Sequence, residues 1–188
     1  TAQGLEKQMG VNHMAHFLLT KLLLDKLLAT PDSRVVNLSS GAHAMGKFDF
    51  EDLYFEKGGY TGFNAYSRSK MANIYFSREM ASRVQGVKVC SVDPGPVRTG
   101  LNRYMIDEKP CMMYCFLCCC MPLTYLVVRS PFWGAQTSLH CSLMPIEQLK
   151  NGQYYSSCKD EQEKFKAGWE EEAKKLWEVS EDTVKQYI

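Results

Sequence analysis

One stretch decides the fold of this chain: Arg34-Val35-Val36-Asn37-Leu38-Ser39-Ser40, a β-branched run that predicts a short strand ending in two serines. An apolar rhythm over residues 5–29 precedes the strand and predicts a long helix that stops at Thr30-Pro31-Asp32. A second helical pattern covers residues 63–84, and residues 87–92 form another strand pattern. This alternation predicts an α/β fold with a parallel sheet and helical crossovers.

The rest of the chain fits one domain. We expect a last strand at Gln153-Tyr154-Tyr155 and a charged helix with an apolar stripe over residues 161–178, whereas residues 41–61 read as a loop. A length of 188 residues is typical of a single domain with a real core, so we assign residues 1–188 to one domain.

Composition excludes some classes of protein. A net charge of +1 without a basic stripe argues against a nucleic-acid partner. Five of the eight cysteines crowd into residues 111–120, which is poor geometry for a paired disulfide framework and favours a reducing, cytosol-facing environment. The first residues do not have the pattern of a secretory signal.

The strongest chemical signal is Tyr66-Ser67-Arg68-Ser69-Lys70, because it lies on a predicted helix downstream of the serine pair. Residues four apart on a helix share one face, so the phenol and the ammonium can cooperate. At about 4 Å and an effective dielectric of about 20, the ammonium favours the phenolate by about 4 kcal/mol. The same spacing recurs at Tyr155 and Lys159, but on a predicted strand, where residues four apart lie about 13 Å from each other.

Four motifs in this order resemble the short-chain dehydrogenase/reductase family, and specifically its retinol dehydrogenase branch. They are the segments 11–20, 34–40, 65–70 and 93–99, which begin with Val11-Asn12-His13, Arg34-Val35-Val36, Ala65-Tyr66-Ser67 and Asp93-Pro94-Gly95. The resemblance implies a Rossmann-like parallel sheet with flanking helices. It also implies hydride transfer between a nicotinamide and an apolar alcohol or its aldehyde or ketone, with retinol and retinaldehyde as the expected pair.

The resemblance also assigns roles to residues. It makes Tyr66 the general acid/base. It makes Lys70 the cation that favours the phenolate form of Tyr66 and a contact to the cofactor ribose. It makes Ser40, rather than Ser39, the donor to the substrate oxygen, and Asn12 the residue that holds a water in the proton relay. The expected cofactor contacts are Tyr66, Lys70, Pro94, Gly95, Val97 and Thr99.

The glycine-rich turn that binds the cofactor diphosphate in this family has no counterpart here. The chain therefore resembles the C-terminal part of such an enzyme, without its N-terminal strands. NADP(H) is the expected cofactor by resemblance, with NAD(H) as the open alternative. The rival hypothesis is a non-catalytic interaction protein that keeps the two long helices through which family members dimerise, so a homodimer is also open.

Two other features need an interpretation. The apolar, cysteine-rich segment Cys111–Val128 is too short and too interrupted for a clear membrane span. It suits a helix that lies on a membrane surface or covers an apolar substrate such as a retinoid or lipid aldehyde. We therefore expect the cytosolic face of the endoplasmic reticulum membrane, with the cytoplasm as the alternative. His13 and His16 lie three residues apart without a third ligand, so we expect no metal site.

Overall fold

A computed structural model describes residues 1–98, 128–161 and 168–188 of the chain. Within them, four strands form one sheet in the order β1-β2-β3-β4. Strands β1, β2 and β3 are parallel, as expected, and β4 returns antiparallel to β3. Their bounds are Arg34–Leu38, Lys88–Asp93, Tyr154–Ser156 and Lys159–Glu161. The run from Tyr155 to Lys159, expected as one strand, instead turns at Ser157-Cys158 and returns as β4, whose three residues are charged and exposed and carry no apolar alternation.

The helix expected over residues 5–29 is interrupted. It consists of α1 (Lys7–Met9), a π-helical turn over Gly10–Met14 and α2 (Ala15–Ala29). The helix expected over residues 63–84 is α3 (Gly62–Arg83). The region 41–61, expected as loop, begins with a short 3-10 helix, Gly41–Met45. The later helices are α6 (Pro131–Leu143), which the pattern did not predict, α7 (Trp169–Val184) and a final turn, Lys185–Tyr187.

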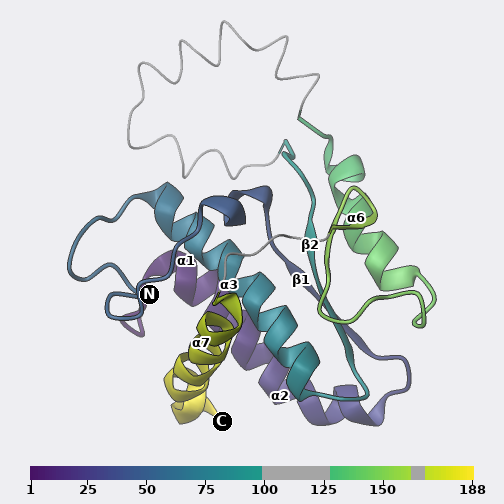
Figure 1. Ribbon diagram of the computed structural model, residues 1–188, viewed down its shortest axis with the longest axis horizontal. Coiled ribbons are helices and arrows are strands. Elements are labelled where there is room, and N and C mark those ends of the chain that lie inside the picture. Colours follow the sequence, from purple (N-terminus) through teal and green to yellow (C-terminus); the bar gives the residue numbers. More distant parts are fainter. Residues whose placement is uncertain (99–127, 162–167) are drawn as a thin grey trace, which may run out of the picture.

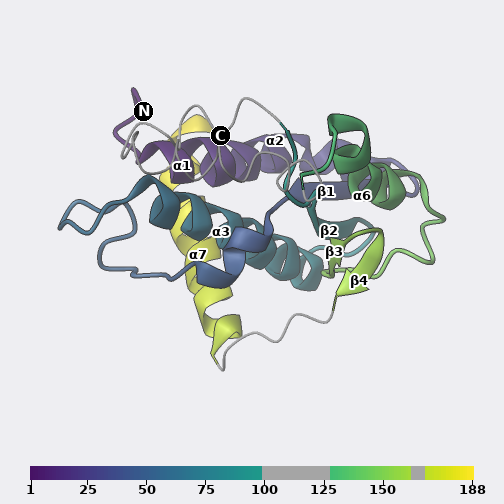
Figure 2. The ribbon, with the colours of Figure 1, turned by 90° about the horizontal axis from the view of Figure 1, so that it is seen from above.

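The helices lie on both faces of the sheet. Helices α2 and α3 pack against one face and α6 packs against the other, as Figures 1 and 2 show. Helix α7 packs along α3 on the side away from the sheet. Both faces of α3 are therefore covered, and the stripe that the sequence predicted as buried is buried: Ala65, Ser69, Ala72, Phe76 and Met80.

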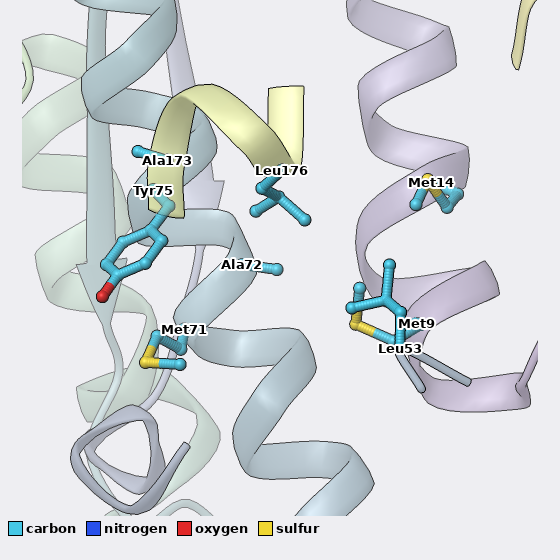
Figure 3. Close-up of a cluster of buried hydrophobic side chains, with 8 residues drawn as sticks. All are labelled: Met9, Met14, Leu53, Met71, Ala72, Tyr75, Ala173 and Leu176. Atoms are coloured by element: carbon cyan, nitrogen blue, oxygen red, sulfur yellow. The ribbon is translucent and has the colours of Figure 1, made fainter. Parts of the chain in front are cut away.

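One apolar cluster fixes the N-terminal helical turns against α3 and α7 (Figure 3). Burying such side chains contributes about 1.5–3 kcal/mol for each large residue, which holds the π-helical turn in place. The members of the cluster are Met9, Met14, Leu53, Met71, Ala72, Tyr75, Ala173 and Leu176.

The strand register brings two loops to one edge of the sheet. Leu38 pairs with Val92, so β1 and β2 end at the same level. The pairing continues one step further, because the N–H of Ser39 donates to the carbonyl of Val92 at 2.8 Å. The chain therefore leaves β1 at Ser39-Ser40 and β2 at Pro94-Gly95 side by side. Open α/β sheets bind their ligands at this carboxyl edge.

Among the described residues, no helix combines the length and the apolar character needed to cross a bilayer. The cysteine-rich segment lies, apart from Val128, outside the described residues, so its predicted role as a covering or membrane-surface helix stays a prediction.

Candidate active site

Tyr66 and Lys70 occupy one face of α3, one turn apart. The Nζ atom of Lys70 lies 5.6 Å from the centre of the Tyr66 ring. The two side chains differ in exposure, because Tyr66 is half-buried whereas Lys70 is buried. The phenol of Tyr66 therefore lies near the protein surface, and the ammonium of Lys70 lies deeper in the fold.

Lys70 is held against the end of β1. Its Nζ donates to the carbonyl of Leu38 at 3.3 Å, and its own carbonyl accepts a bond from the Ser39 hydroxyl at 2.8 Å. Burial lowers the pKa of the Lys70 ammonium below its ordinary value. The same burial keeps water away from the ammonium, so its charge is screened less than the charge of an exposed lysine.

The two serines of the pair have different environments. Ser39 is buried and its hydroxyl proton is donated to Lys70, which makes it part of the scaffold. Ser40 is half-buried, and its Oγ accepts a bond from the N–H of Ala42 at 3.3 Å. Accepting this bond does not use the hydroxyl proton, so Ser40 can still donate to a substrate oxygen.

Asn12 lies in the π-helical turn and faces α3. Its Nδ2 donates to Gln8 Oε1 at 2.9 Å and to Ser69 Oγ at 3.0 Å. Ser69 in turn donates to the carbonyl of Tyr66 at 2.8 Å, so the amide of Asn12 is joined to the turn of α3 that carries the phenol. A π-helical turn inside a helix frequently marks a functional site.

Asn73 connects these parts, and no role was predicted for it. Its Nδ2 donates to the carbonyl of Asn12 at 2.9 Å and to the carbonyl of Leu38 at 3.0 Å. Its Oδ1 lies 3.3 Å from Nδ1 of His13, a residue whose only sequence signal was its spacing from His16. The position of Asn73 on the helix face of Tyr66 and Lys70, at intervals of seven and three residues, was the signal that could have identified it.

The predicted cofactor segment follows β2. Gly95 has a φ of 71°, and its N–H donates to Asp93 Oδ1 at 2.9 Å. The other oxygen of Asp93 lies 3.4 Å from where a Cβ on Gly41 would stand, so the loops after β1 and β2 touch. The side chain of Val97 packs against Gly134 of α6, which leaves main-chain groups as its contribution to a ligand site. Thr99 lies outside the described residues.

Comparisons with known proteins show the family of this chain. The sequence profile described as short chain dehydrogenase matches residues 1–110. Human retinol dehydrogenase 12 is 43% identical over 182 residues, which cover 96% of this chain and 54% of that protein. Mouse retinol dehydrogenase 14 is 42% identical over 187 residues, which cover 96% of this chain and 53% of that protein.

The solved structures give the same fold. A putative uncharacterized protein from Mycobacterium paratuberculosis superimposes with a TM-score of 0.70 and 26% identity, over 98% of this chain and 61% of its own length. A short chain dehydrogenase from Salmonella enterica gives a TM-score of 0.51 at 22% identity, over 79% of this chain and 51% of its own length, and supports the fold alone.

The chain belongs to the short-chain dehydrogenase family, a family of oxidoreductases. It resembles the retinol dehydrogenases within that family and spans about half the length of the curated relatives it matches. The family and the Rossmann-like fold predicted from the sequence are thereby confirmed.

Proposed function

We propose that this chain forms the catalytic half of an NADP(H)-dependent oxidoreductase that interconverts an apolar alcohol and its aldehyde or ketone, with retinol and retinaldehyde as the substrate class. The observation that carries the proposal is the half-buried phenol of Tyr66 beside the buried ammonium of Lys70. The substrate class rests on the names of the relatives, which are retinol dehydrogenases at 39–43% identity.

Each residue has a distinct task in this proposal. Ser40 donates a hydrogen bond to the substrate oxygen and so orients it towards Tyr66. Tyr66 gives its proton to that oxygen during reduction and takes the proton back during oxidation. Lys70 stabilises the phenolate that remains, because opposite charges at short range favour the ionised form. Asn12 supports the turn of α3 that carries the phenol and holds the water through which the proton exchanges with solvent.

The nicotinamide cofactor supplies or accepts the hydride when it is bound. The residues present fit its nicotinamide end. Gly95 at positive φ allows a ligand to approach the backbone closely, and Val97 offers main-chain groups, with Lys70 as a ribose contact. The choice between NADP(H) and NAD(H) is made elsewhere in this fold, so NADP(H) is proposed from the resemblance.

The partners follow from the substrate class. An apolar aldehyde partitions into membranes, so we propose that the enzyme works at a membrane surface, on the cytosolic face of the endoplasmic reticulum. A homodimer built on both long helices has less support, because α7 of the same chain packs along α3. A dimer would have to use the outer face of α2, where Leu19 and Leu22 are exposed.

A chimaera tests the proposal. This chain replaces the matching part of human retinol dehydrogenase 12, and reduction of all-trans-retinaldehyde is followed with NADPH. We expect turnover, and we expect Lys70→Ala to lower kcat and to raise KM for NADPH. A folded chimaera that binds NADPH but reduces no apolar aldehyde, while the parent enzyme is active, would disprove the proposed function.

A further inference from the structure

Arg129 precedes α6 and reaches back to the turn after β2. Its Nη1 donates to the carbonyl of Pro94 at 3.2 Å, and its Nη2 donates to the hydroxyl of Ser157 at 2.8 Å. One guanidinium therefore joins the predicted cofactor segment to the turn between β3 and β4. A planar fork with several fixed donors suits this bridge, whereas an ammonium is a single point of contact.

The main chain of Arg129 also forms hydrogen bonds with the segment after β2. The N–H of Arg129 donates to the carbonyl of Pro96 at 2.7 Å, and the carbonyl of Arg129 accepts from the N–H of Arg98 at 3.0 Å. These two bonds make a parallel bridge between Val97 and Arg129. Because the bridge uses the neighbours of Val97, the N–H and C=O of Val97 itself point to the opposite side.

Two glycines let the parts approach closely. A Cβ on Gly95 would stand 3.1 Å from Cζ of Arg129, so the guanidinium lies flat against the glycine backbone. A Cβ on Gly134 would stand 2.4 Å from Cγ2 of Val97, so the first turn of α6 seats that side chain. Both contacts fix the distance between the segment after β2 and the start of α6.

The other end of the bridge is also anchored. Ser157 and Cys158 form the two-residue turn of the β3–β4 hairpin, with φ values of 51° and 62°. The N–H of Cys158 lies 3.4 Å from Oγ1 of Thr137, a buried residue of α6. The turn that carries the Ser157 hydroxyl, the acceptor for Arg129, therefore contacts α6, and α6 packs on the sheet.

We propose that Arg129 is a positioning residue that sets the geometry of residues 94–97, so that the N–H and C=O of Val97 face the nicotinamide carboxamide. The proposal rests on the proposed function. A segment already held in its binding geometry loses less conformational entropy when the cofactor binds, which increases affinity. Arg129 itself contacts no substrate, and its effect is transmitted through Pro94, Gly95 and Val97.

The first test uses the 188-residue chain and no cofactor. Hydrogen exchange is measured at the amides of Gly95 and Arg98 for wild type and Arg129→Met. Loss of the guanidinium contacts to Pro94 and Ser157 should accelerate exchange at both amides by about tenfold, because the free energy of local opening becomes smaller. Ser157→Ala, which removes one acceptor, should give a smaller acceleration. The control is Arg83→Met, which removes an ion pair with Glu79 at the far end of α3 and should leave both amides unchanged.

The second test uses the chimaera with human retinol dehydrogenase 12. Arg129→Met should raise KM for NADPH by about tenfold and change KM for retinaldehyde by less than about twofold. Arg129→Lys should recover only part of the affinity for NADPH, because lysine restores the positive charge but not the planar set of donors of the guanidinium. A residue that only stabilised the fold would reduce the amount of active enzyme without this selective change in KM.

The outcomes separate the two proposals. If wild-type chimaera is active and Arg129→Met leaves KM for NADPH unchanged, the positioning role is disproved. Unchanged exchange at Gly95 and Arg98 in Arg129→Met also disproves it. If the variant shows fast exchange and the wild-type chimaera binds NADPH without turning over any apolar aldehyde, the bridge stands and the proposed function fails.

Discussion

The Nε2 atom of His13 lies 2.9 Å from the hydroxyl oxygen of Ser180, and this contact joins the π-helical turn to α7 across 167 residues of sequence. His13 is buried, and its Nδ1 faces the Oδ1 of Asn73 at 3.3 Å. Nδ2 of Asn73 donates to two carbonyls, so its Oδ1 is the acceptor that faces the ring, and the Ser180 hydroxyl also lies 2.7 Å from the carbonyl of Leu176. The ring therefore links α7 to the network that includes Asn12.

This link makes stability depend on pH. Burial lowers the pKa of His13 from 6.5 to about 4. Between about pH 6.5 and pH 4, His13 is protonated in the unfolded chain but neutral in the folded chain. The free energy of unfolding therefore falls as the pH drops through this range, and His13 causes no further loss below about pH 4. Over the whole range the shift in pKa lowers the free energy of unfolding by about 3 kcal/mol.

Urea unfolding of wild type and His13→Gln at pH 7 and pH 4.5 measures this contribution. The variant should be less stable at pH 7, and the difference between the two proteins should shrink at the lower pH. His16→Gln is the matched control, because His16 is exposed on the same helical run and lowers the pKa of His13 less than burial does, so the pH dependence should change less than in His13→Gln. Equal pH dependence in wild type and His13→Gln would contradict the assignment.

We expect the 188-residue chain alone to bind nicotinamide cofactors poorly. The sequence lacks a glycine-rich turn, whose N–H groups and helix N-terminus hold a diphosphate in this fold. NADPH and NADH are titrated while tryptophan fluorescence is followed, and the response should not saturate in the micromolar range. A dissociation constant of a few micromolar would show that the chain binds the cofactor without that turn.

The outer face of α2 and the edge of β1 should make the isolated chain associate. Leu19, Leu22 and Leu23 are 54%, 56% and 44% exposed, and among the described residues β1 pairs with β2 alone. Exposed leucines together with an open sheet edge favour aggregation. The double variant Leu19→Lys/Leu22→Glu should therefore increase the monomeric fraction in light scattering after gel filtration.

The control for this prediction is Leu143→Lys, a change at a still more exposed leucine at the end of α6. It should alter the monomeric fraction less than the α2 variant. A wild-type chain that is already monomeric at high concentration would contradict the prediction.

Strong periodic patterns made much of the fold predictable. The strand ending at Ser39-Ser40 and the helix that carries Tyr66 were placed to within about two residues, because β-branched runs and helical stripes are the most reliable sequence signals. The π-helical turn at Asn12 was not predictable, since the apolar rhythm continues through it and a single glycine, Gly10, is tolerated within a helical pattern. Helix α6 was missed because its stripe is weak and four of its large apolar residues are exposed: Phe132, Trp133, Leu139 and Leu143.

The sequence suggested the residues of the candidate site but not the contacts between them. The motif order suggested Asn12, Ser40, Tyr66 and Lys70, and the fold brings them to the end of β1 and the adjoining face of α3. The bonds of Asn73, His13 and Arg129 depend on contacts between distant parts of the chain, and a single sequence does not reveal such contacts.

The central claim, that Tyr66 is the general acid/base, is tested most directly by kcat of the chimaera with Tyr66→Phe. Phenylalanine keeps the ring but lacks the exchangeable proton, so kcat should fall by about 10²-fold or more while KM for NADPH stays nearly constant. Tyr155→Phe is the matched control, because within the described part of the chain the Tyr155 hydroxyl accepts a bond from the N–H of Lys150 alone; this change should leave kcat within about twofold. If Tyr66→Phe retained more than about a tenth of the wild-type kcat, Tyr66 would not be the general acid/base.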